Sequence, residues 1–127
     1  MKHQYVGDAN DYRKYALLLR ALSARGANRV GVCWMLTPDD GGADGNKLAY
    51  LGQPERFRHI DPNLFDILGH AASESDRRRL HTIEDSDAIA GALYHNETLP
   101  DKAASHHALM ECCRLNATTL AIEDLAA

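Results

Sequence analysis

The first hydrophobic positions of the chain have helical spacing. Between residues 12 and 22, apolar side chains recur every three or four residues. Asp8 or Asn10 can cap the start of this segment, and Gly26 can end it in a turn. The sequence therefore predicts a first helix from about residue 8 to about residue 26. The residues expected on its core face are Tyr12, Tyr15, Leu18, Leu19 and Leu22.

Beyond this helix the pattern changes to short runs that are typical of strands. Residues 29–36 (RVGVCWML) form a continuous apolar run, which favours a buried strand. Residues 79–84 (RLHTIE) alternate, and residues 117–122 (ATTLAI) are rich in β-branched side chains, so both are predicted strands. Residues 48–51 fit either a short strand or a helical turn.

Helical segments separate these predicted strands. Asp61 followed by Pro62 is a strong helix start, and residues 85–94 and 103–115 are also predicted helices. Strands that alternate with helices imply right-handed crossovers and a largely parallel sheet. Residues 1–127 are therefore predicted to form a single α/β domain of about three mostly parallel strands and four to five helices.

Composition narrows the class of protein. The chain has a formal net charge of −4, which argues against a general nucleic-acid binder, since such proteins are usually basic. No apolar signal core follows Met1, and the longest apolar run, from Val30 to Leu36, is too short to cross a bilayer. Three cysteines without a pairing pattern fit a reducing compartment. These features predict a cytoplasmic protein with no membrane contact.

Acidic residues follow every predicted strand. Asp39, Asp40 and Asp44 come after the first, Glu84 and Asp85 after the second, and an acidic pair follows the third. Ligands of parallel sheets bind beyond the carboxyl ends of the strands, so these carboxylates could hold a ribose, a metal or an amine. For any one of these acids, however, the favoured interpretation is that it caps the following helix or fills a turn. The histidines, cysteines and acids show no convergent metal-ligand spacing, so no metal site is predicted.

The opening segment carries a resemblance to known families. Its pattern Gly7-Asp8-x-x-Asp11-Tyr12-x-Lys14-Tyr15-x-Leu17-Leu18 resembles a family of uncharacterised bacterial and phage proteins that open with GDxxDYxKYxLLRAL. The likeness continues through residues 32–39, 44–51 and 61–66. The opening is also distantly similar to ribosomal-RNA adenine methyltransferases, in which a Gly-Asn-x-x-Asp-x-x-Lys helix precedes a Rossmann-like domain.

This resemblance implies roles for particular residues. Asp11 and Lys14 would match the acid and the lysine of the methyltransferase helix. The loop after the first strand would bind the methyl donor, and Glu84 would take the position of the ribose-binding acid. The chain departs from the pattern in two places: the first loop has no GxG phrase, and residues 120–127 lack the Asp-Pro-Pro-Tyr-like phrase that holds the target amine.

These departures indicate a small, truncated, Rossmann-like three-layer domain. A sheet cut after three strands leaves an open apolar edge, and such edges associate unless they are covered. We therefore expect a homodimer whose interface involves the last helix and strand.

Two classes of function follow. The favoured hypothesis is a non-catalytic protein-binding module derived from a methyltransferase-like fold and using no cofactor. Such a module could act as a phage or mobile-element inhibitor of host defence, of the anti-CRISPR type. Exposed aromatic and arginine side chains would bind the protein partner, because such groups dominate interface energies. The candidates are Tyr50, Arg56, Phe57, Arg58, Arg77, Arg78 and Arg79.

The alternative is an enzyme. A nucleic-acid methyltransferase that uses S-adenosylmethionine as a dimer would depend on Asp11, Lys14, Asp39 and Asp44, with Glu84 binding the cofactor. A metal-dependent nuclease could be built on the same acids. A nucleic-acid partner is therefore retained as an alternative.

Overall fold

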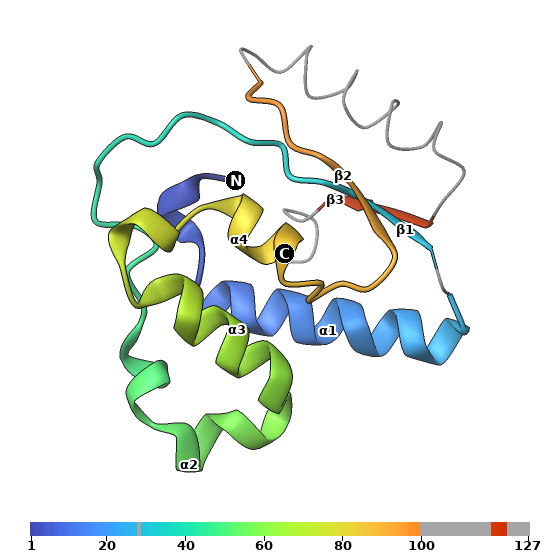
Figure 1. Cartoon of the computed structure of the whole chain (residues 1–127), viewed down its shortest axis with the longest axis horizontal. Coiled ribbons are helices and arrows are strands. Elements are labelled where there is room, and N and C mark those ends of the chain that lie inside the picture. Colours follow the sequence, from blue (N-terminus) through green and yellow to red (C-terminus); the bar gives the residue numbers. More distant parts are fainter. Residues whose placement is uncertain (28, 100–117, 122–127) are drawn as a thin grey trace.

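The computed structural model describes residues 1–27, 29–99 and 118–121 (Figure 1). Short 3-10 turns alternate with the longer elements. In chain order the elements are η1 (His3–Tyr5), α1 (Ala9–Arg25), β1 (Val30–Cys33), η2 (Ala49–Gly52), α2 (Pro54–Phe57), η3 (Arg58–Ile60), α3 (Pro62–Ala72), η4 (Ser75–Arg77), α4 (Leu80–Asp85), β2 (Ala92–His95) and β3 (Thr118–Ala121).

The strands form a small parallel sheet in the order β2-β1-β3. Val30 at the start of β1 lies opposite Ala92 of β2 on one side and Thr118 of β3 on the other. Figure 1 shows α1 running along one side of this sheet, with α2 and α3 grouped near the amino-terminal end of α1. The prediction of a mixed α/β chain with a parallel sheet is confirmed, whereas the three-layer Rossmann-like arrangement stays a prediction.

The predicted first helix is confirmed at both ends. Asp8 is its N-cap, with a side-chain oxygen that accepts from the Asn10 amide at 2.9 Å. Gly26 ends it in the left-handed region, at a φ of 63°. Its core face is also as expected, because Tyr12, Tyr15, Leu18 and Leu22 are buried; Leu19 packs partly buried against them.

The predicted strand over residues 79–84 is wrong, because this segment forms helix α4. Leu80 and Ile83 are its buried residues, and their three-residue spacing places both on one face of a helix. In a strand these two side chains would point to opposite faces of the sheet. Tertiary burial of that pair therefore outweighs the apparent alternation of RLHTIE.

The predicted helix over residues 85–94 is also wrong. Asp87 and Gly91 both have positive φ, at 56° and 73°, which interrupts any helix. The chain turns there and enters β2 at Ala92. Residues 49–52 resolve the other open assignment, since they form the 3-10 turn η2.

The two faces of β1 meet different parts of the core. Val30, Val32 and Trp34 belong to the main hydrophobic cluster with α1 and α3, whereas Cys33 contacts Leu99 on the other side. This alternation is the two-residue period of a strand. β3, predicted over residues 117–122, is confirmed at Thr118–Ala121. The predicted helix 103–115 lies outside the described residues, as does the part of the expected dimer interface that it would supply.

A group of aromatic rings joins α1 to the α2–α3 region. Tyr12 stacks on Tyr50 with ring centres 5.5 Å apart, and Phe57 and Phe65 meet these rings edge-on. Tyr50 is only 7% exposed, and its hydroxyl donates to the Gly7 carbonyl oxygen at 2.9 Å. The expectation that Tyr50 is an exposed binding residue is therefore wrong: its ring fills the core.

Helix α3 begins as predicted. The Asp61 side chain accepts a hydrogen bond from the Leu64 amide at 3.1 Å, and Pro62 occupies the first turn. Leu64, Phe65 and Leu68 form the buried face.

None of the helices in the described part of the chain combines the length and apolar character needed to cross a bilayer.

Candidate functional site

A pocket of about 420 Å³ opens between the first turn of α1 and residues 43–47, in the loop that follows β1. Its lining is rich in charged and amide side chains. It consists of Tyr5, Asp8, Asn10, Asp11, Lys14, Ala43, Asp44, Gly45, Asn46 and Lys47. Three of the four candidate catalytic residues, Asp11, Lys14 and Asp44, therefore line one pocket, although residues 11 and 44 are far apart in sequence.

Asp8 joins the two walls of this pocket. One of its carboxylate oxygens caps α1, and the other accepts from the Lys47 amide at 2.9 Å. The Ala9 amide in turn donates to the Lys47 carbonyl oxygen at 3.0 Å. Since Asp8 is only 3% exposed, these bonds are shielded from water and hold the loop on the start of the helix.

The glycines of both walls permit close backbone approach. Gly7 has a φ of 84°, and a Cβ there would lie 2.9 Å from the Cβ of Ala72 on α3. Gly45 has a φ of 85°, and a Cβ there would lie 2.6 Å from the Gln4 carbonyl oxygen. Glycine is thus the residue that both backbone conformation and available space require at these two positions.

Asp11 is the buried acid of the pocket. It is 1% exposed, and burial raises the pKa of its carboxyl to about 7. The nearby Asp8 adds to the rise, whereas Lys14, whose Nζ lies 4.0 Å from Asp11 Oδ1, opposes it. Hydrogen bonding from the Gly7 backbone and the Tyr15 side chain also lowers the pKa. The group is therefore poised between its neutral and ionised forms near neutral pH.

The start of α1 does not offer a phosphate site. The amides of Ala9, Asn10, Asp11 and Tyr12 all donate within the protein, to Lys47 or to Asp8. A phosphate cradle needs such amides free. The charged side chains instead comprise three carboxylates and two ammonium groups. This arrangement suits a small ligand that carries both positive and negative groups.

Two other predicted site residues lie elsewhere. Asp39 accepts hydrogen bonds from the Gln4 amide at 3.2 Å and from Arg79 at 3.4 Å. Glu84 lies on α4 rather than at the end of a strand, and it accepts from Trp34 Nε1 at 2.7 Å. Neither residue lines the pocket at α1.

The arginines proposed for partner binding have separate contacts. Arg77 pairs with Glu74 at 3.1 Å, and Arg79 with Asp39 at 3.4 Å. Arg78 instead donates to backbone carbonyls of the pocket region. Residues 77–79 are therefore not a uniform exposed basic run.

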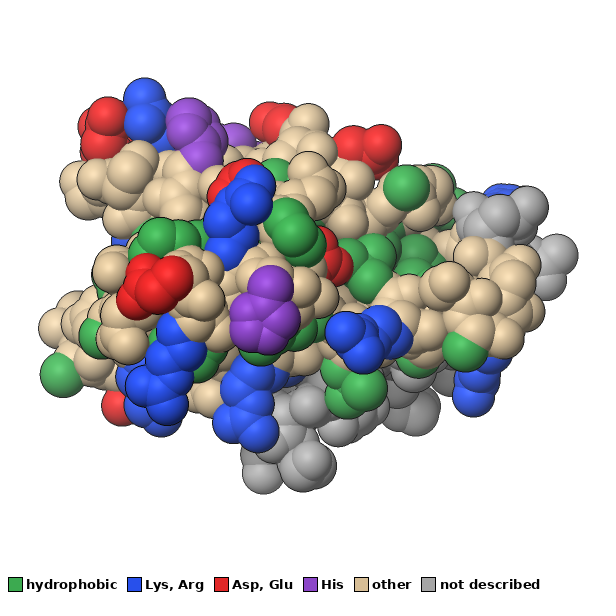
Figure 2. All heavy atoms as spheres, turned by 90° about the horizontal axis from the view of Figure 1, so that it is seen from below, with side chains coloured by type: hydrophobic (Ala, Val, Ile, Leu, Met, Phe, Trp, Pro, Cys, Tyr) green, Lys and Arg blue, Asp and Glu red, His purple; other side chains and the backbone are tan. Residues whose placement is uncertain are grey.

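The remaining partner-binding candidates lie around α2. Arg58 pairs with Asp66 through two hydrogen bonds, at 2.9 and 2.7 Å. The Arg56 guanidinium lies over the Phe57 ring, 5.1 Å from its centre. Arg56 and Arg58 are exposed as expected, and Phe57 is half-buried. Figure 2 shows lysine and arginine side chains spread across the face of the molecule seen from below.

Sequence reasoning missed several residues of the pocket. Tyr5, Asn10 and Asn46 line it, as does Lys47. Residues 44–47 carry part of the family resemblance, which was a signal that the loop has a role. Their placement on α1 depends on the Asp8–Lys47 bonds, which no local pattern predicts.

Within residues 1–27, 29–99 and 118–121, no three histidine, cysteine or acidic side chains converge as a metal site. Comparison of the chain with protein-family models, with curated proteins and with solved structures finds no match. The arrangement of the pocket is therefore the basis for assigning a function.

Proposed function

We propose that this protein binds S-adenosylmethionine in the pocket at the start of α1, as a Rossmann-like domain of the methyltransferase type. One observation carries the proposal: Asp11 and Lys14 of the opening motif meet Asp44 of the loop after β1 in one pocket. These are the two segments that the resemblance to ribosomal-RNA adenine methyltransferases assigns to the donor end of the domain. The volume of about 420 Å³ is within the range of small-ligand pockets.

The charges of the pocket match those of this ligand. S-adenosylmethionine carries a sulfonium, an ammonium and a carboxylate. Asp11 and Asp44 supply negative charge for the cationic groups, and Lys14 or Lys47 supplies a partner for the carboxylate. The amides at the start of α1 already donate hydrogen bonds within the protein, so they disfavour nucleotides with phosphate chains.

The other hypotheses stay predictions with less support. The hypothesis of a protein-binding module has less support because Tyr50, one of its candidate binding residues, is buried. A metal-dependent nuclease gains no support from the described residues, in which no ligand cluster was found. Methyl transfer to a nucleic acid is compatible with the donor pocket and is tested separately, and the homodimeric state stays a prediction.

Isothermal titration calorimetry with S-adenosylmethionine tests the proposal. We expect micromolar affinity for this ligand and no binding of ATP. Asp44→Asn should weaken binding about tenfold, because it removes one carboxylate that faces the cationic groups. Asp76→Asn is the matched control, since Asp76 carries the same charge on the exposed turn η4 and does not line the pocket.

Absence of binding at about 1 mM ligand would show that the proposal is wrong. Equal loss of affinity in the two variants would exclude this pocket as the binding site. Incubation with radiolabelled donor and bulk RNA or DNA then separates an enzyme from a donor-binding module, because only an enzyme labels the nucleic acid.

A further inference from the structure

Arg78 connects three distant parts of the chain behind the pocket. It follows η4, and its Nε donates to the Val6 carbonyl oxygen at 3.0 Å. Its Nη2 donates to the Gly45 carbonyl oxygen at 2.7 Å and also to the Gln4 carbonyl oxygen. Its Nη1 donates to Asn46 Oδ1 at 3.0 Å. All three guanidinium nitrogens are therefore used on the amino-terminal segment and the loop.

The acceptors of Arg78 lie on both sides of one contact. Gln4 and Val6 belong to the segment before α1, whereas Gly45 and Asn46 belong to the pocket wall. Among the described residues, Arg78 pairs with no carboxylate, so its positive charge is stabilised there by hydrogen bonds to uncharged carbonyl and amide oxygens. Gly45 leaves no room for a side chain against Tyr5 and Gln4, so the two segments are in direct backbone contact at this point.

We propose that Arg78 is the positioning residue of the pocket: its guanidinium holds residues 45–46 against residues 4–6 and thereby fixes Asp44 and Lys47 beside α1. The planar fork of an arginine can reach several carbonyl oxygens at fixed angles, which the single ammonium of a lysine cannot. The consequence for ligand affinity rests on the proposed function, whereas the consequence for the loop does not.

The neighbouring arginine offers a matched control. Arg77 pairs with Glu74 and donates to Ser73 Oγ, and it is not among the described residues that line the pocket. Arg77→Gln therefore removes the same charge one residue away. Arg78→Gln removes the fork and the charge, and Arg78→Lys removes the fork alone.

Hydrogen exchange of the full chain without ligand tests the positioning role. We expect the amides of residues 43–47 to exchange at least about tenfold faster in both Arg78 variants, with the amides in the middle of α1 unchanged. Arg77→Gln should leave both sets unchanged. Unchanged exchange in the loop, or equal acceleration in α1, would overturn the proposal, because Arg78 would then either hold nothing or support the whole fold.

A split between stability and affinity gives a second readout. Arg78→Lys should recover most of the melting temperature lost in Arg78→Gln, yet bind S-adenosylmethionine about tenfold more weakly than the wild type. Affinity restored to the wild-type value by lysine would contradict the role of the fork. If the wild type itself binds no S-adenosylmethionine, the proposed function fails, and the exchange experiment still decides the role of Arg78.

Discussion

Two aspartates in the same turn have opposite chemical situations. Asp8 accepts hydrogen bonds from the amides of Asn10 and Lys47, so its negative charge is compensated. Asp11 is equally buried, but Lys14 is 4.0 Å away and burial dominates its pKa. Asp8 is therefore a structural carboxylate, and Asp11 is the group in the pocket whose protonation can change near neutral pH.

Replacing Asp11 by asparagine should stabilise the protein increasingly as the pH rises. The folded-state pKa of about 7 lies above the unfolded value of 3.8, so the folded state binds the proton more tightly between these values. The cost of ionising Asp11 is absent below about pH 4 and complete above about pH 7. The melting temperature of Asp11→Asn should exceed that of the wild type by several degrees at about pH 8 and by little at about pH 4.5. A difference that does not vary with pH would contradict this assignment.

Binding of a cationic ligand should release a proton from Asp11. A positive group beside the carboxyl favours its ionised form, so affinity for S-adenosylmethionine should rise between about pH 6 and about pH 8. Calorimetry in buffers with different ionisation enthalpies measures the released proton. Asp11→Asn separates this proton from those of the ligand and of the other pocket groups, and an unchanged proton release in that variant would exclude Asp11 as the source.

At the scale of elements, the junction of α1 and α3 depends on a glycine of the opening motif. Gly7 adopts a positive φ immediately before the cap of α1, and its missing side chain lets Ala72 of α3 approach. The motif residue therefore has a packing reason that is independent of any ligand.

Gly7→Ala should lower the free energy of unfolding by about 2–4 kcal/mol, combining the cost of a positive φ with that of a clash. Gly26→Ala is the matched control, because Gly26 has a φ of 63° and open space around it. It should cost only about 1 kcal/mol. Urea denaturation measures both, and adding Ala72→Gly to Gly7→Ala should recover the clash part. Equal costs for the two glycines would exclude a packing role.

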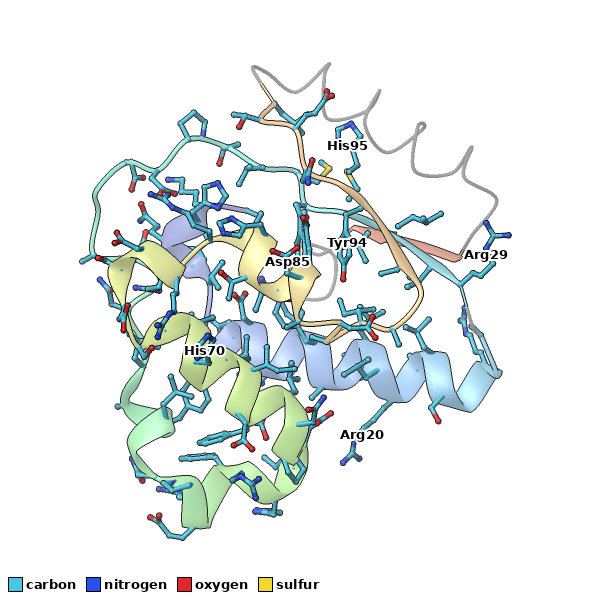
Figure 3. The ribbon with its side chains drawn as sticks, viewed as in Figure 1. Arg20, Arg29, His70, Asp85, Tyr94 and His95 are labelled. Atoms are coloured by element: carbon cyan, nitrogen blue, oxygen red, sulfur yellow. The ribbon has the colours of Figure 1, made fainter. Side chains whose placement is uncertain are left out.

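At the scale of the whole molecule, Trp34 joins the sheet to the helices. It is fully buried, stacks on Tyr94 of β2 with ring centres 5.6 Å apart, and meets Tyr15 of α1 edge-on. Its Nε1 donates to Glu84 on α4. Figure 3 shows Tyr94 on β2, and it shows Arg20 and Arg29 extending away from the fold.

The Trp34–Glu84 hydrogen bond should be measurable as a coupling free energy. We expect a double-mutant cycle of Trp34→Phe and Glu84→Ala, followed by circular dichroism in urea, to give about 1–2 kcal/mol, since the acceptor is charged. Glu74→Ala in place of Glu84→Ala is the control, because Glu74 pairs with Arg77 on the surface. A coupling near zero in the first cycle would mean that the bond adds nothing to stability.

The features that the sequence predicted are those with local causes. The caps at Asp8 and Asp61 and the core face of α1 depend on residues within a few positions of one another. The apolar run of β1 likewise predicted a buried strand, because an apolar run this short favours a strand over a buried helix. The opening motif indicated Asp11 and Lys14 as site residues, and both line the pocket.

Only the tertiary structure decided the rest, because burial and loop placement depend on residues far apart in sequence. Residues 79–84 were predicted as a strand, but Leu80 and Ile83 face a common core and the segment forms helix α4. Residues 85–94 were predicted as a helix, but the chain enters strand β2 at Ala92. Tyr50 is buried because α1 and α3 supply rings around it. The pocket exists because Asp8 bonds to Lys47 and Arg78 bonds to Gly45, contacts that span more than thirty residues in each case and leave no periodic trace in the chain.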